Sequence, residues 1–121
     1  MTRMPDASFP VRTVDGIPVV STPEEVDITN AAGLRAALLE SAGQGNGTLV
    51  VDMSRTQFCD TAGLHSLVRA HKLAQAEGGG LLLVVTAGAV LRILAVTGLD
   101  HVIPRFASLE EALASGPAVA G

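Results

Sequence analysis

The chain has 121 residues, a net charge of −4 and a hydrophobic content of 48%. This length suits one domain with a packed core, and the apolar content excludes intrinsic disorder. The mildly negative charge and the lack of Trp and Tyr argue against a nucleic-acid-binding surface. The apolar runs are shorter than a membrane span and no secretory leader is evident, so we expect a cytoplasmic protein without a membrane anchor.

The first expected elements are two strands, over residues 9–14 and 17–22. They flank Asp15-Gly16, a pair of residues that favours a tight hairpin turn. Pro10 and Pro18 cannot donate backbone hydrogen bonds, so they place this hairpin at an edge of the sheet.

A helix is expected after the hairpin, with Thr29 or Asn30 as its N-cap. Its apolar stripe has helical spacing and consists of Ala31, Leu34, Leu38 and Ala42. The glycine-rich segment 43–47 then turns the chain into an apolar strand over residues 48–53.

The remaining elements alternate between helix and strand. We predict a long helix over residues 61–77 with Asp60 as N-cap, a strand over 81–85, a third helix that ends at Gly98, an edge strand over 102–106, and a short last helix opened by the capping box Ser108-Leu109-Glu110-Glu111. This alternation predicts an α/β domain with parallel neighbouring strands. We expect the domain to cover residues 9–114, between flexible tails over residues 1–8 and 115–121.

One stretch resembles a known family. The strand Val50-Val51-Asp52-Met53-Ser54 is followed by Phe58-Cys59-Asp60-Thr61-Ala62-Gly63-Leu64. This resembles the signature of STAS domains, the family of bacterial anti-sigma factor antagonists, in which a strand ending in Asp-x-Ser precedes an apolar residue, Asp-Ser-Ser-Gly-Leu and a helix. The resemblance extends from about Phe9 to Ala114. It implies a mixed, mostly parallel sheet of four or five strands with about four helices largely on one face.

Thr61 stands at the position of the family's phosphoacceptor. Its place at the first turn of a helix suits an added anion, because the free amide groups there carry partial positive charge. Two residues depart from the family pattern, since Thr61 replaces a serine and Ala62 replaces the second serine. The alternative role for the Thr61 hydroxyl is that of a second helix cap.

The resemblance also implies a partner-binding surface around Thr61. It contains Asp60, Ala62, Gly63, whose lack of a side chain permits close backbone approach, and Asp27 from a loop near the mouth of the same helix. His65 lies four residues after Thr61 and therefore on the same helical face. Capping and turn formation are the alternative roles of Asp60 and Asp27, and His65 is otherwise a solvated helix residue.

The sequence predicts neither a metal site nor a catalytic site. One cysteine and three scattered histidines give no zinc-ligand spacing, and we expect Cys59 to be a buried apolar filler and His71 to be half-buried and hydrogen-bonded. The glycine-rich segments 43–47 and 78–80 precede strands, which is the reverse of a phosphate-binding loop. We therefore expect no cofactor and no enzymatic activity.

The function implied by the resemblance is a phosphorylation switch. The unmodified domain would bind an anti-sigma factor with a serine-kinase fold and release the sigma factor, until the kinase modifies Thr61; a phosphatase would reset the domain. Two alternatives stay open: a non-switching STAS scaffold or subunit of a stress-signalling or lipid-transport assembly, and a small-ligand or nucleotide-binding domain. The sequence leaves the oligomeric state open.

Overall fold

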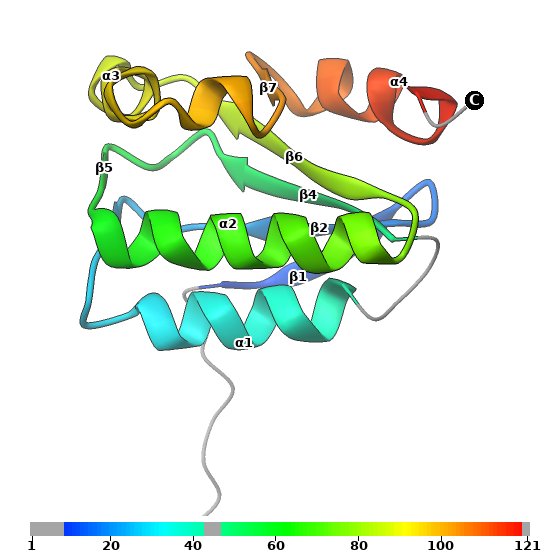
Figure 1. Ribbon diagram of the computed structural model, residues 1–121, viewed down its shortest axis with the longest axis horizontal. Coiled ribbons are helices and arrows are strands. Elements are labelled where there is room, and N and C mark those ends of the chain that lie inside the picture. Colours follow the sequence, from blue (N-terminus) through cyan, green and yellow to red (C-terminus); the bar gives the residue numbers. More distant parts are fainter. Residues whose placement is uncertain (1–8, 43–46, 120–121) are drawn as a thin grey trace, which may run out of the picture.

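The computed structural model describes residues 9–42 and 47–119, which form a mixed sheet flanked by helices (Figure 1). The five strands of the sheet lie in the order β1-β2-β4-β6-β7. Their bounds are Val11–Val14 for β1, Ile17–Ser21 for β2, Thr48–Met53 for β4, Gly80–Val85 for β6 and Arg105–Phe106 for β7. The predicted α/β class and number of strands are confirmed.

The hairpin is the antiparallel part of the sheet. β1 and β2 are joined at Asp15 and Gly16, whose φ angles of 52° and 80° suit the tight turn that the sequence predicted. β2 pairs with β4, β4 with β6 and β6 with β7, all in parallel. Only β1 is an edge strand of this hairpin, because β2 has a neighbour on each side.

A second, two-stranded parallel sheet was not predicted. It pairs β3 (Glu25–Val26) with β5 (Phe58–Cys59), in the register Glu25 to Phe58 and Val26 to Cys59. β5 lies between the end of β4 and the start of the second helix, at one end of the molecule (Figure 1). This small sheet joins two segments that are far apart in the sequence and that carry the predicted site.

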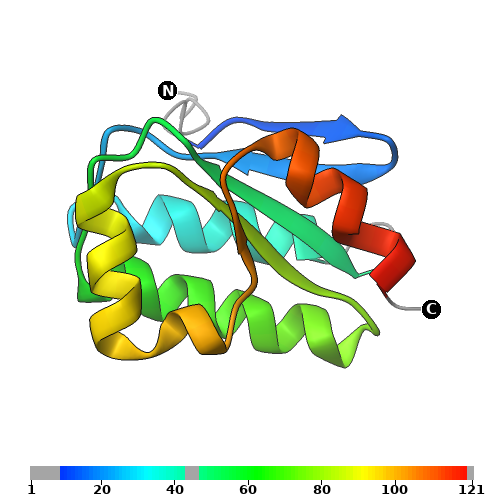
Figure 2. The same ribbon diagram turned by 90° about the horizontal axis from the view of Figure 1, so that it is seen from above.

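Helices cover both faces of the main sheet, as the two ribbon views show (Figures 1 and 2). The helices are α1 (Ala31–Ala42), α2 (Thr61–Ala76), α3 (Gly88–Thr97) and α4 (Leu109–Val119), with a short 3-10 turn η1 (Leu99–His101) after α3. Buried residues of α1, α2 and α3 share one core cluster, whereas α4 packs into a cluster on the opposite face. The expectation that helices lie largely on one face is therefore confirmed.

The two core clusters follow the alternation of side chains along the central strands. In β4, Leu49 and Val51 face the cluster beneath α1 and α2, and Val50 faces the cluster beneath α4. All four predicted stripe residues of α1 are buried: Ala31, Leu34, Leu38 and Ala42. An inner strand buried on both faces explains the unbroken apolar runs of β4 and β6.

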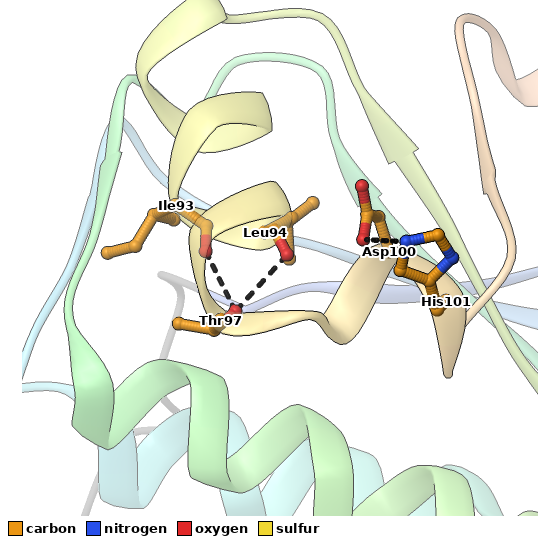
Figure 3. Close-up of polar contacts among 5 residues, drawn as sticks. All are labelled: Ile93, Leu94, Thr97, Asp100 and His101. Atoms are coloured by element: carbon orange, nitrogen blue, oxygen red, sulfur yellow. Dashed lines mark hydrogen bonds and ion pairs between the residues drawn. The ribbon is translucent and has the colours of Figure 1, made fainter.

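The end of α3 also agrees with the sequence. Gly98 adopts a left-handed conformation with φ of 80°, which stops the helix. Near this end, the Thr97 hydroxyl donates to the carbonyl oxygens of Ile93 and Leu94 at 2.7 and 3.2 Å (Figure 3). In the following turn η1, the Asp100 carboxylate lies 3.7 Å from His101 Nε2.

The last helix differs from the prediction at both ends. At its start, Ser108 Oγ accepts from Glu111 N at 3.1 Å, but the Glu111 carboxylate accepts from Ala107 N at 3.3 Å rather than from the cap residue's own amide. At its end, α4 runs to Val119, beyond the predicted domain boundary at Ala114. The added segment contains Gly116 and Pro117, which have the lowest helix propensities, so nothing in the local sequence predicts this continuation. The predicted tail over residues 1–8 lies outside the described residues.

No helix within the described ranges has the length and apolar character needed to cross a membrane.

Candidate functional site

The mouth of α2 is built around Asp60. This residue is the N-cap, and its Oδ1 accepts from the amides of Ala62 and Gly63 at 3.0 and 3.2 Å. These bonds satisfy two of the amide groups that a helix leaves unpaired in its first turn. Asp60 therefore has the capping role that the sequence predicted.

The same carboxylate also reaches a second segment. Asp60 Oδ2 accepts from the backbone amide of Ile28 at 3.2 Å, and Asp60 N donates to Val26 O at 3.0 Å. The loop between β3 and α1 thus lies against the mouth of α2, as the resemblance implied.

Asp27 has its own local hydrogen bonds within that loop. Its Oδ1 accepts from the hydroxyl of Thr29 and from the amide of Thr29, the latter at 2.9 Å. The Thr29 hydroxyl bond and then its amide bond hold the pKa of Asp27 below the usual value of 3.8, so this carboxylate is ionised at neutral pH. Asn30 fixes the same turn, because its side chain accepts from Asp27 N and donates to Glu25 O, each at 2.9 Å.

Thr61 is the first residue of α2 and is exposed to solvent. His65, one turn further along the helix, is also exposed, and Ala62 between them is half-buried. The structure thus brings Asp27, Asp60, Thr61 and His65 to one end of the molecule. Thr61 is therefore accessible to another protein's active site, beside the carboxylates of Asp27 and Asp60.

Gly63 is buried, and the close approach that it permits is made to the chain's own small sheet. A Cβ atom at this position would stand 2.7 Å from both Cys59 Sγ and Val26 Cγ1. The glycine therefore lets α2 lie directly on β3 and β5.

Cys59 is buried beneath the helix mouth. Burial, with a smaller contribution from the charge of Asp60, raises the pKa of its thiol to about 12, so the thiol stays protonated and unreactive. No group of three or more His, Cys, Asp or Glu side chains in the described segments could hold a metal ion.

Two buried threonines, which the sequence analysis did not single out, hold the loops behind the site together. The Thr56 hydroxyl donates to Pro23 O at 2.7 Å and contacts the Thr22 hydroxyl. In addition, Thr22 N donates to Asp52 O at 3.1 Å. These bonds join the connection before β3 to the connection before β5. Nothing in the local sequence pattern distinguishes such threonines from surface ones, because their partners are more than thirty residues away.

A cavity of about 270 Å³ lies at the far ends of α2 and β6 from Thr61. His71 lines it and is buried, and its Nδ1 accepts from Leu81 N at 3.1 Å. Burial lowers the pKa of His71 below 6.5, against the opposing effect of a hydrogen bond with the Val102 backbone. His71 is therefore hydrogen-bonded as predicted, although it is more deeply buried than expected. None of the described residues that line the cavity is Lys, Arg, Asp or Glu, so these residues offer no such charged group to a nucleotide.

The fold and the site define a small α/β domain whose candidate functional region is an exposed surface at the mouth of one helix, rather than a cleft. The sequence matches the STAS domain family over residues 8–112. The chain belongs to this family, which confirms the resemblance inferred from the strand-turn-helix segment around Thr61.

Several known proteins are similar to this chain. The anti-sigma-F factor antagonist RsfB of Mycobacterium tuberculosis H37Rv is 33% identical over 101 residues, which cover 82% of this chain and 80% of that protein. The crystal structure of an anti-sigma factor antagonist from Mycobacterium paratuberculosis is 29% identical with a TM-score of 0.83, and the match covers 95% of this chain and 98% of that one. The phosphorylated form of the Bacillus cell fate determinant SpoIIAA has the same fold, with a TM-score of 0.68, 20% identity and coverage of 88% and 96%.

Proposed function

We propose that this protein is an anti-sigma factor antagonist, a binding module controlled by phosphorylation and not an enzyme. Unmodified, it binds an anti-sigma factor that has a serine-kinase fold, and the sigma factor is released. The kinase then phosphorylates Thr61 and the complex separates. A phosphatase removes the phosphate and restores binding.

The observation that carries this proposal is the position of Thr61. Thr61 is exposed at the first turn of α2, where a kinase can reach it, and it occupies the phosphoacceptor position of the family signature. A phosphate there gains from the helix N-terminus, an attraction that is below about 1 kcal/mol at most surfaces and reaches about 2 kcal/mol in favourable sites. Phosphorylation is therefore compatible with a folded domain.

The complex is more sensitive to the same charge. A phosphate adds about −1.5 to −2 charges at neutral pH, beside the carboxylates of Asp60 and Asp27. Solvent screens the repulsion between the phosphate and these carboxylates in the free domain, whereas a bound partner excludes that solvent. Two unit charges about 4 Å apart then interact by about 4 kcal/mol at an effective dielectric of about 20. A remaining penalty of about 2.8 kcal/mol in the complex weakens binding about a hundredfold.

The relatives support the same proposal. RsfB is named as an anti-sigma-F factor antagonist and is the relative with 33% identity. SpoIIAA is described in a phosphorylated form, so one protein of this fold is known to carry the modification.

The test is a phosphorylation reaction with the serine-kinase-fold anti-sigma factor of the host, ATP and Mg²⁺. We expect one phosphate per molecule of this protein, located on Thr61 by mass spectrometry. The Thr61→Ala variant serves as the control and should stay unmodified while it still binds the kinase. Phosphate on another residue, or none on the wild-type protein when the complex forms, would favour the non-switching scaffold.

A further inference from the structure

Two large apolar side chains beside the site are exposed to solvent. Ile28 is 78% exposed in the loop between β3 and α1, and Phe58 is 50% exposed in β5. Neither belongs to the partner surface that the sequence predicted. Exposed apolar groups of this size beside a functional site are typical of protein-binding surfaces.

Both residues are attached to the segments that hold the phosphoacceptor. The amide of Ile28 donates to Asp60 Oδ2 at 3.2 Å, and Phe58 stands three residues before Thr61. In the small sheet, Phe58 pairs with the exposed Glu25, while the next pair, Val26 and Cys59, is buried. Phe58 therefore lies on the outer side of the β3–β5 pair.

The β3 side of the two residues is acidic, whereas the exposed Arg55 stands three residues before Phe58. Glu24 and Glu25 are exposed, and Asp27 is ionised in the loop next to Ile28. A partner that covers this area needs apolar groups for the two side chains and cationic groups for the carboxylates around them.

We propose that Ile28 and Phe58 are the apolar anchors through which the unphosphorylated domain binds the anti-sigma factor, at an apolar pocket whose bordering Lys or Arg side chains face Glu24 and Glu25 rather than Thr61. This inference rests on the proposed function. The occupant is the kinase-fold partner because a protein that reaches the Thr61 hydroxyl must also approach the segments that carry both anchors. A phosphate on Thr61 repels the Asp60 carboxylate, which accepts the hydrogen bond from the Ile28 amide. Phosphorylation therefore disturbs the position of the Ile28 anchor in addition to changing the charge of the surface.

The test compares affinities by isothermal titration calorimetry. The probes are the serine-kinase-fold anti-sigma factors encoded in the host genome, each produced in pure form. Ile28→Ser and Phe58→Ser should each weaken binding about tenfold or more, since each variant removes a large apolar side chain that the partner would bury. Phe58→Leu should keep most of the affinity.

Leu39→Ser in α1 and Leu73→Ser in α2 are matched controls, because these leucines are 48% and 45% exposed. Leu73 lies about 18 Å along α2 from Thr61, at 1.5 Å per residue. Both controls should bind like the wild-type protein. Thermal melts of all five variants should show that none is unfolded at the temperature of the titration.

The outcomes separate this inference from the proposed function. If the wild-type domain binds and Thr61→Glu does not, but Ile28→Ser and Phe58→Ser bind normally, only the anchors are wrong. If no kinase-fold protein binds the wild-type domain, the proposed function and the anchors are both wrong. If Phe58→Ser only converts a dimer into a monomer in sedimentation experiments, the surface contacts a second copy and the inference is overturned.

Discussion

At the residue scale, Asp60 makes two kinds of contact. It caps α2, and it also accepts a hydrogen bond from the loop that carries Asp27 and Ile28. A helix cap is therefore also the link between the two segments of the candidate site. The cap could be predicted from sequence because Asp directly before an apolar-periodic helix is a local signal. The bond to Ile28 could not, since it joins residues far apart in the chain.

Replacing Asp60 tests both kinds of contact. Asp60→Ala should lower the free energy of unfolding by about 1–2 kcal/mol, because it removes the cap and leaves the Ile28 amide without its partner. Asp60→Asn retains an accepting oxygen and should lose less. Urea denaturation measures both variants, and an Asp60→Ala variant as stable as the wild-type protein would show that these bonds contribute nothing.

Gly63 provides a second prediction at this scale. Gly63→Ala should destabilise the protein by about 1–3 kcal/mol, because the new methyl group would overlap short side chains on β3 and β5 that have little freedom to move. Gly88, the first residue of α3, has open space around it, so Gly88→Ala is the matched control and should be neutral or slightly stabilising. Equal thermal stability of the two variants would contradict this account of the helix approach.

At the scale of elements, the sequence predicted the parts of the fold that depend on local pattern. The Asp15-Gly16 turn, the stripe of α1 and the buried strands β4 and β6 all follow from neighbouring residues. β3 and β5 escaped prediction because each is two residues long and its pairing joins segments more than thirty residues apart. The site depends on this small sheet, so its geometry could be expected only through the family resemblance.

His71 links two elements, since it lies on α2 and accepts from the amide of Leu81 in β6. Its pKa in the folded protein is below 6.5, so the unfolded chain binds more protons at mildly acidic pH. Its contribution to stability should be complete above pH 6.5 and should be lost as the pH falls from 6.5 toward the folded-state pKa. The slope is at most about 1.4 kcal/mol per pH unit.

Denaturation at several pH values, compared with His71→Asn, checks this prediction. The asparagine oxygen can accept from Leu81 N, but the side chain does not titrate. The variant should therefore show a flatter dependence of stability on pH below 6.5. An identical slope in both proteins would mean that the histidine keeps the same proton affinity when the chain folds.

At the scale of the whole molecule, the two ends of the sheet carry different groups. The mouth of α2, β5 and the loop before α1 lie at one end (Figure 1). This end carries the exposed Thr61, the carboxylates of Asp27 and Asp60, and the two proposed apolar anchors. The opposite end carries the cavity beside His71, and no Lys, Arg, Asp or Glu stands among the lining residues that the structure describes. We therefore expect a change of charge at the first end to act on a surface and to leave the core beneath α1 and α2 intact.

The most direct test of this account is the affinity of the anti-sigma factor for two forms of the full chain, unmodified and phosphorylated on Thr61, at the same ionic strength. We expect the phosphorylated form to bind about a hundredfold more weakly while its circular dichroism spectrum and melting temperature stay close to those of the unmodified form. Equal affinities of the two forms, or a phosphorylated form that is unfolded, would contradict the proposed switch.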